Sequence, residues 1–227
     1  KIKEDLAIEI PPDILDVRKI EGKVVSNRNE ATFIKELVIE LPEEEAFDFQ
    51  PGAYVQFDVP PYRLSFRDFD IDSAFRDAWD AQGLWDLQAR NEEPVFRAYS
   101  MANYPAEKGR IILNIRIATP PRKGVPPGIA SSYLFGLQAG DGVSLSGPFG
   151  DFMIKDTDRE MVYLGGGAGM APMRSHVLHL LHTLRSTRRI SYWYGGRSLR
   201  ELFYVDDFQA LEHEHERFSF HVALSEP

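Results

Sequence analysis

The sequence predicts a β-barrel followed by part of an α/β domain with a parallel sheet. Residues 17–156 hold short strand-like runs separated by Gly and Pro turns, whereas residues 157–227 alternate strand, helix, strand, helix and strand. Short strands with tight turns are typical of barrels and sandwiches, and the alternating order is typical of a doubly wound parallel sheet. A chain of 227 residues is long enough for two such domains.

The barrel half is expected to consist of antiparallel strands. Polar and apolar residues alternate over 53–59, as they do in a half-buried antiparallel strand. Runs rich in β-branched residues mark the other strands. The expected elements are strands at 17–26 and 32–41 around a turn at 27–29, strands at 53–59, 95–102, 110–118 and 142–146, and a helix at 128–138.

Residues 60–94 are expected to form an insertion between two strands. They are rich in aromatic and charged residues, among them Phe66, Trp79 and Trp85, and 71–88 is expected to contain a short helix. Long ordered insertions in compact domains tend to be functional. A packed surface loop is the alternative, and the residues alone do not decide between the two.

The second half is expected to form a three-stranded parallel sheet. The expected elements are strands at 160–164, 189–194 and 218–224, with helices at 170–184 and 199–216 between them. Three strands are few for a parallel sheet, whose faces and edges need cover. We therefore expect further partners of this sheet beyond Pro227.

Composition excludes several functions. A net charge of −9 argues against sequence-independent nucleic-acid binding, which depends on clustered Lys and Arg. The chain has no cysteine, so disulfides and Cys-ligated zinc or iron–sulfur centres are excluded within it. No run approaches the ~18 consecutive apolar residues that span a bilayer, and the first residues lack the apolar core of a signal peptide. The chain is expected to be soluble.

Five of the six histidines fall into two groups. His176, His179 and His182 recur at intervals of three on a predicted helix, which places neighbours on one side of it. No carboxylate stands at a supporting offset, so they are expected to be surface residues. His213 and His215 lie two apart in an acidic run and are expected to be solvated. We therefore predict no metal site.

The tetrapeptide Arg97-Ala98-Tyr99-Ser100 is the first candidate binding motif. Arg97 and Tyr99 lie two apart, so they share one face of a strand, while Ser100 points to the other. An Arg can pair bidentately with a diphosphate, a Tyr ring can stack on a flat ligand, and a Ser hydroxyl can meet a ring nitrogen. A flavin needs all three. The alternative is a surface strand whose Tyr lies at the edge of the core.

Two glycine motifs that precede helices are candidate anion sites. Gly128 to Ser132 begin a helix whose free N–H groups and positive dipole end favour a diphosphate, and Ser131 and Ser132 add hydroxyl groups. Gly165 to Gly169 follow a strand and precede a helix, where glycines let backbone N–H groups approach a pyrophosphate. Pro172 stands near the place of the last glycine of the G-x-G-x-x-G fingerprint, so this loop departs from it.

These motifs, in this order, resemble the ferredoxin–NADP reductase family. They are Arg97-x-Tyr-Ser, Gly128-x-x-Ser-Ser, Gly147-Pro-Phe-Gly and Gly165-Gly-Gly-Ala-Gly-x-Ala-Pro. The aromatic insertion, 114–121, 194–198 and 203–208 make the chain most similar to one branch of that family, the flavin subunits of bacterial sodium-translocating NADH:quinone oxidoreductases. The resemblance covers nearly the whole chain.

The resemblance implies FAD in the barrel domain and NADH on a Rossmann-like domain. Hydride would pass from NADH to the flavin, and electrons would then go singly to a [2Fe–2S] cluster in a ferredoxin-like domain of the same subunit. That domain, a membrane anchor and a C-terminal Cys-Gly-Pro segment belong to the family pattern and are missing from residues 1–227. Residues 1–16 are expected to be the last strand of the ferredoxin-like domain or a linker.

The resemblance also implies a place for the whole subunit. It would lie at the cytoplasmic face of the bacterial inner membrane and contact the other subunits of a membrane complex that reduces quinone.

Matching positions imply a role for each motif. Tyr99 and Ser100 are expected beside the reacting part of the flavin. The residues expected to hold FAD are Tyr54, Arg97, Ala98, Tyr99, Ser100, Asn114, Arg116, Gly128, Ile129, Ala130, Ser131 and Ser132. The residues expected to hold NADH are Gly165, Gly166, Gly167, Ala168, Gly169, Met170, Pro172, Arg197, Ser198 and Glu226.

Three alternatives stay open at this point. Arg197 fits NADH or NADPH on its chemistry, and only the resemblance favours NADH. The reductase component of an oxygenase uses the same flavin and nicotinamide parts. A flavin-binding module without turnover is the alternative outside the enzymes.

Overall fold

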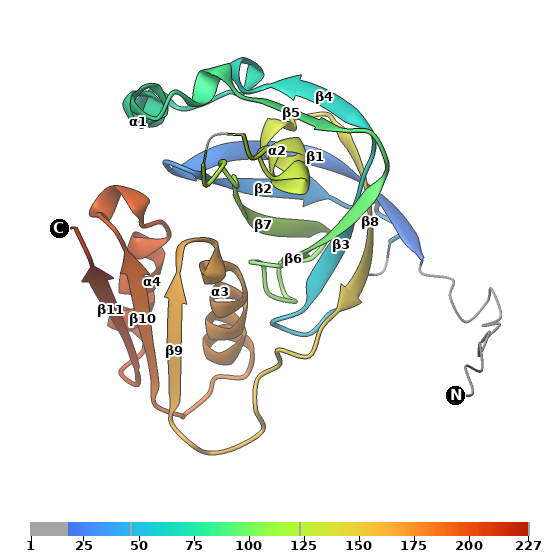
Figure 1. Ribbon diagram of the computed structural model, residues 1–227. Coiled ribbons are helices and arrows are strands. Elements are labelled where there is room, and N and C mark those ends of the chain that lie inside the picture. The colour runs from blue at the N-terminus through green and yellow to red at the C-terminus, as the bar shows by residue number, and fades with distance from the viewer. Residues whose placement is uncertain (1–17, 46, 123, 227) are drawn as a thin grey trace, which may run out of the picture.

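The computed structural model describes residues 18–45, 47–122 and 124–226, and the predicted linker at 1–16 lies outside them. The described residues form a six-stranded antiparallel sheet and a three-stranded parallel sheet, with a small two-stranded antiparallel sheet beside the first (Figure 1). In sheet order, the six strands are β6 (Val95–Ser100), β3 (Tyr54–Val59), β8 (Gly142–Phe149), β1 (Lys19–Ala31), β2 (Ile34–Glu40) and β7 (Arg110–Arg116).

The six-stranded sheet closes on itself. The strand β6 leads into Met101, which forms an antiparallel bridge with Leu113 of β7. Next to it the Ala102 N–H donates to the Ile112 carbonyl at 2.7 Å. These two contacts bring the end strands of the sheet together, and every other pairing in the sheet is also antiparallel. The predicted barrel is therefore confirmed.

The turn predicted at 27–29 is wrong. Strand β1 runs on to Ala31, so Asn27 and Asn29 are paired with β2 rather than placed between the strands. The Asn27 amide instead donates to the Leu134 and Leu137 carbonyls, at 2.9 and 2.8 Å. These carbonyls lie at the end of helix α2 (Ile129–Gly136), so an asparagine that suggests a turn in the sequence serves as a helix C-terminal partner here.

The insertion forms part of the barrel core. It holds β4 (Tyr62–Ser65), the short helical turns Phe66–Asp68, Ser73–Phe75 and Leu84–Asp86, α1 (Arg76–Ala81) and β5 (Gln88–Asn91). The Trp79 ring is fully buried among Phe66, Phe69 and Phe135, with ring centroids 5.9–6.1 Å away. Its indole N–H donates to the Thr32 carbonyl at 2.9 Å. The segment is therefore too well packed to be only a surface loop.

The second sheet is parallel, as predicted, with the order β11 (Phe218–Leu224), β10 (Ile190–Gly196) and β9 (Met161–Gly166). Helix α3 (Met170–Leu178) continues as one π-helical turn (His179–Thr183) and lies between this sheet and the barrel (Figure 1). Helix α4 (Val205–Glu214) packs on the same buried face of the sheet, through Phe208 and Leu211.

The helix predicted at 199–216 is interrupted. A short turn at Leu199–Glu201 comes first, and α4 begins only after Tyr204, whose φ of 58° is left-handed. A left-handed residue cannot continue a right-handed helix. Tyr204 is held in this conformation by contacts with the barrel, which are described below.

One face of the parallel sheet is exposed among the described residues. Val162, Leu164 and Trp193 are 60%, 71% and 45% exposed, while Tyr163, Tyr192 and Tyr194 are buried on the opposite face. No helix in the described part of the chain is both long and apolar enough to cross a membrane.

We predict that Trp79→Ala destabilises the protein by about 3–5 kcal/mol, because it leaves a large cavity in the core shared by insertion and barrel. Chemical denaturation followed by circular dichroism measures the change. The control is Trp193→Ala, since that ring is 45% exposed and its removal leaves no cavity. Equal effects of the two substitutions would contradict the placement of the insertion in the core.

Candidate functional site

Strand β6 presents the tetrapeptide motif at the end of the barrel sheet. Arg97 pairs with Phe57 and Tyr99 with Val55, so these two side chains share one face, and Ser100 lies on the other face opposite Tyr54. The Tyr99 ring meets Phe57 edge-on at 6.0 Å, and burial raises the pKa of its hydroxyl to about 12. The Arg97 side chain is exposed, and its guanidinium donates to the Phe96 carbonyl at 2.7 Å.

Tyr54 connects two of the sequence motifs. It lies opposite Ser100 on one side and Phe149 on the other, and its ring is 5.7 Å from the Phe149 ring. A Cβ at Gly150 would come within 2.9 Å of the Tyr54 ring. The last glycine of the Gly-Pro-Phe-Gly motif is therefore required by the close approach of a tyrosine that is itself expected to contact the ligand.

Helix α2 begins without a side-chain cap from any described residue. Among the described residues no side chain caps its first turn, so the N–H groups of that turn remain available to a ligand. The Ser131 hydroxyl is committed to the protein, since it accepts from the Ala118 N–H at 3.1 Å and donates to the Gly128 carbonyl at 3.2 Å. Ser132 is fully buried. The helix therefore offers backbone N–H groups rather than the Ser131 hydroxyl.

Tyr62 of the insertion contacts the start of α2, and the sequence motifs gave no sign of it. Its hydroxyl donates to the Ile129 carbonyl at 2.5 Å, and its ring is 5.5 Å from Tyr133. Burial raises the pKa of Tyr62 to about 12, and Tyr62 in turn contributes to the raised pKa of Tyr99. Its position in an aromatic stretch just before the Arg97 motif was the available signal.

The second glycine motif joins β9 to α3. Gly167 has a φ of +53°, which other residues adopt only with strain, and a Cβ at Gly166 would lie 3.2 Å from the Gly195 carbonyl oxygen. The loop makes one short turn at Gly167–Gly169 and leads into the uncapped N-terminus of α3 at Met170. This is the close backbone approach that a pyrophosphate site needs.

A cleft of about 890 Å³ lies between the barrel and the parallel sheet, and residues of both line it. It is lined by Arg116 of the barrel, by Gly166 and Gly167, and by Ser198 and Glu226 after β10 and β11. These residues were predicted from separate motifs. The cleft lies at the carboxyl ends of the parallel strands, which is where open parallel sheets commonly bind ligands. The barrel motifs at Tyr54, β6 and α2 do not line this cleft.

Arg197 and Glu226 pair with each other at the edge of this cleft. The Arg197 Nη2 atom lies 3.0 Å from both carboxylate oxygens of Glu226, and the Glu226 N–H donates to the Arg197 carbonyl at 2.7 Å. Both side chains are exposed. The pair places one positive and one negative charge at the position where the two residues were expected to meet the nucleotide.

The insertion also reaches the cleft. Ala78 and Gln82 line it, and Arg200 from the α/β half pairs with Asp77 of α1, with one contact at 2.9 Å. The Arg200 guanidinium also lies 5.3 Å from the Phe75 ring. Figure 1 shows α1 on the side of the molecule toward which β9, β10 and β11 point. The insertion therefore forms one wall of the cleft.

A half-buried polar joint connects the two halves of the molecule. The Tyr204 hydroxyl donates to the Glu36 carboxylate and accepts from the Asn114 amide at 2.9 Å. Arg174 of α3 pairs with Glu107 at 2.9 Å, and its guanidinium lies 5.2 Å from the Tyr204 ring. The Asn114 side chain is 5% exposed and engaged here, so its expected contact with flavin stays a prediction.

The expectation that His176 lies on the surface is wrong. It is 2% exposed, its Nδ1 lies 3.2 Å from the Tyr163 hydroxyl, and its Nε2 lies 3.1 and 3.0 Å from the Pro51 and Phe152 carbonyls. Burial lowers its pKa. Helix α3 packs against the barrel as well as the sheet, which buries a helix face that a single-sheet domain would leave in solvent.

Glu30 lies beside this joint. Burial, followed by the neighbouring carboxylates of Glu36 and Asp207, raises its pKa from 4.5 to about 7. Because the group is close to half exposed, solvent screening moderates the effect of these charges on stability.

Comparisons with known proteins agree with this architecture. Residues 84–154 match the oxidoreductase FAD-binding domain, and residues 163–227 match the oxidoreductase NAD-binding domain. An Amycolatopsis cytochrome P450 reductase is 26% identical, with a TM-score of 0.67 over 92% of this chain and 53% of that one. A Neisseria gonorrhoeae ferredoxin NADP⁺ reductase, at 16% identity, shares the fold with a TM-score of 0.66 over 93% of this chain and 70% of its own. The fold is thus that of FAD- and NAD-binding oxidoreductases.

More similar relatives define the family. The F subunit of a Na(+)-translocating NADH-quinone reductase from Shewanella putrefaciens is 54% identical over the whole of this chain and 75% of its own length. The corresponding F subunit from Klebsiella pneumoniae is 53% identical over the whole of this chain. This chain belongs to the F-subunit family of Na(+)-translocating NADH-quinone reductases. It spans 56% of the length of the Klebsiella relative.

We predict that Glu30→Gln raises the melting temperature at pH 8 by about 2–4 °C and has little effect at pH 5. The folded state holds the Glu30 proton more tightly than the unfolded state, so native stability falls as pH rises from 4.5 to about 7. Glutamine has no carboxyl proton to lose, so the variant keeps this stability at the higher pH. Exposed Glu40→Gln is the control, and a gain at pH 5 as large as at pH 8 would contradict the assignment.

We also predict that Asp77→Ala loosens the insertion from the cleft. Exposed ion pairs contribute up to about 1 kcal/mol, so amides of 74–82 should exchange hydrogen up to about fivefold faster. The matched control is Asp86→Ala, which removes an exposed aspartate that pairs with Arg67 inside the insertion. Similar acceleration in both variants would show that Arg200 does not anchor the insertion.

Proposed function

We propose that this chain is the region that takes electrons from NADH onto FAD in a sodium-translocating NADH:quinone reductase. The observation that carries the proposal is the cleft in which Arg116 of the FAD-binding barrel faces the glycine loop of the NAD-binding sheet. We assign residues 17–156 to the FAD domain and 157–227 to part of the NADH domain, a division supported by the two family matches.

The barrel motifs fit FAD. Uncapped N–H groups at the start of α2 would hold the diphosphate, and Arg97, whose exposed guanidinium bonds only its neighbour's carbonyl among the described residues, would neutralise it. Tyr99 is half buried and would flank the flavin ring. Tyr54 and Ser100, which lie opposite each other on the second face of β6, would approach it from that side.

The glycine motif fits the pyrophosphate of NADH. Gly166 lies beside the Gly195 backbone, and α3 begins at Met170, directly after the short turn Gly167–Gly169. We propose that Glu226 favours NADH over NADPH, because its carboxylate holds Arg197 and would repel an additional phosphate. The other residues of the predicted NADH set are Gly165, Ala168, Gly169, Met170, Pro172 and Ser198.

Bound FAD would accept a hydride from NADH and release the two electrons one at a time. The protein's part is to orient the two cofactors and to exclude water between them, and the α1 wall of the cleft contributes to the second task. We assign to Ser100 a hydrogen bond near the reacting nitrogen of the flavin, because its hydroxyl lies at the end of β6 beside Tyr54.

Family membership supports a proposal for the further partners. We propose that the electrons go to a [2Fe–2S] cluster in a ferredoxin-like domain of the same subunit, and from there to the membrane complex that reduces quinone at the cytoplasmic face of the inner membrane. The oxygenase reductase alternative is supported by the 26% identical cytochrome P450 reductase, against 54% identity to the Shewanella relative.

The first test is retention of FAD by the purified chain and by Arg97→Ala. The chain should carry the absorption of bound flavin, and the variant should bind FAD about tenfold or more weakly, because a charge-assisted contact to phosphate is lost. Arg110→Ala, another exposed strand arginine, is the control. A chain that binds no FAD would refute the proposed function.

The second test is stopped-flow bleaching of the bound flavin by NADH. Rapid bleaching supports the reductase, and bound but unresponsive FAD supports a binding module without turnover. Ser100→Ala should slow bleaching about tenfold while FAD affinity changes less, because its hydrogen bond is assigned to the reacting atom. Ser144→Ala on β8 is the control, and equal losses of rate and affinity in Ser100→Ala would contradict the assigned role.

A further inference from the structure

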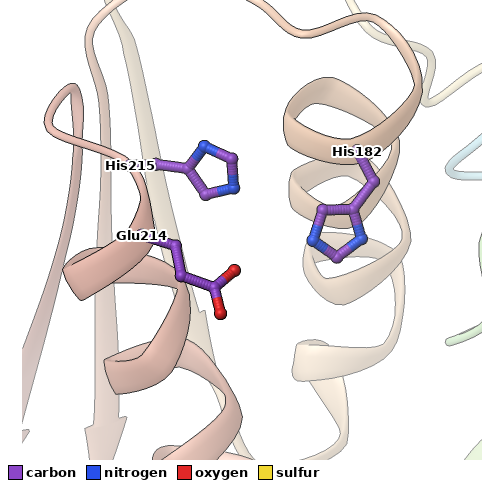
Figure 2. Close-up of side chains that lie close together, drawn as sticks. All are labelled: His182, Glu214 and His215. Atoms are coloured by element: carbon purple, nitrogen blue, oxygen red, sulfur yellow. The ribbon is translucent and has the colours of Figure 1, made fainter.

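We propose that His182, Glu214 and His215 form a binding site for a divalent transition metal ion, with Zn²⁺ as the ion that best fits the donor set. The three side chains face one another between the π-helical turn after α3 and the C-terminal end of α4 (Figure 2). One donor atom from each lies within 4.8 Å of the other two.

The donors are free to bind. Among the described residues, neither imidazole nor the Glu214 carboxylate has a hydrogen-bond partner, whereas the neighbouring Glu212 accepts from the Phe220 N–H at 2.9 Å. The His182 and His215 rings lie 6.1 Å apart, and the Tyr104 ring meets His182 edge-on at 5.9 Å. His182 is exposed and His215 is half-buried, and a histidine without a hydrogen-bond partner keeps an imidazole lone pair available for a metal.

The donor set selects the class of ion. Two imidazole nitrogens and one carboxylate oxygen suit Zn²⁺, and also Cu²⁺ and Ni²⁺, better than Mg²⁺ or Ca²⁺, which prefer oxygen donors alone. Donors around tetrahedral zinc are about 3.3 Å apart, so these atoms need to approach by roughly 1.5 Å at most. Rotation of the exposed His182 and Glu214 side chains provides this shift, and water can complete the coordination from solvent.

The surroundings leave room for an ion, and one nearby side chain carries a positive charge that opposes it. The three residues line an open pocket of about 480 Å³ together with Leu181, Arg185 and Ser186. The Arg185 guanidinium opposes a cation, but the side chain is exposed and long enough to turn toward solvent. The Glu214 carboxylate supplies the compensating charge at the centre of the site.

The site is separate from the cofactor cleft. His182 comes before the start of β10, and Glu214 and His215 come before the start of β11, whereas the cleft lies at the carboxyl ends of the same strands. A bound ion would therefore connect the ends of the two helices at the opposite edge of the sheet. His182 also lies in a π-helical turn, a conformation that is frequent at functional sites.

Equilibrium dialysis of the untagged 227-residue chain against Zn²⁺ tests the proposal, with thermal denaturation as the second readout. The native chain should bind one Zn²⁺ and melt at a higher temperature with it, because the ion binds the folded state. His182→Ala and His215→Ala should each weaken binding at least about tenfold, and Glu214→Gln should weaken it too. Circular dichroism confirms that each variant is folded.

The control is His213→Ala, which removes an exposed histidine next to Glu214 that is outside the cluster. Its Zn²⁺ affinity should match that of the native chain. The proposal is overturned if His182→Ala binds Zn²⁺ as tightly as the native chain, or if His213→Ala loses as much affinity as the cluster variants. Neither readout requires FAD or NADH, so the result is independent of the proposed function.

Discussion

The position of the cleft between barrel and parallel sheet depends on the polar joint that connects these two parts. The Tyr204 hydroxyl bonds Glu36 and Asn114 of the barrel, and Arg174 pairs with Glu107 and lies against the Tyr204 ring. Since burying such groups unpaired is costly, the joint accepts one arrangement of the two halves and resists others. It also explains why Tyr204 is left-handed and why α4 starts where it does. The glycine loop and Arg116 are therefore held on opposite sides of one cleft.

The insertion contributes both to the barrel core and to the lining of the cleft. Trp79 completes the barrel core, Tyr62 holds the start of α2 near Tyr99, and Asp77 reaches across to Arg200 at the cleft. A segment anchored by a buried tryptophan can place polar residues at a ligand site with little motion, because the core fixes its backbone. The structure shows that the insertion is packed, and that this packing positions Tyr62 and Asp77, while its functional role stays a prediction.

The elements that the sequence predicted well are those with a strong local pattern. The alternation over 53–59 predicted β3 and its buried face, and the strand–helix order after residue 157 predicted the parallel sheet. The errors lie where a residue with a familiar local preference has a distant partner. Asn27 suggests a turn but bonds the end of α2, and His176 suggests a helix surface but is enclosed by the Pro51 and Phe152 carbonyls. Local preference is weak, so tertiary contacts override it.

The sequence by itself determined the order of the motifs, and with it the fold class and the family. Spacing within a motif is set by backbone geometry over a few residues, so Arg97 and Tyr99 share a face and Gly167 allows a turn whatever surrounds them. Only the tertiary structure decided which motifs meet. Arg116 faces the glycine loop, and His182 meets Glu214 and His215, because packing brings together residues that are far apart in the chain. The residue pattern within one helix or strand does not show which distant residues will contact it.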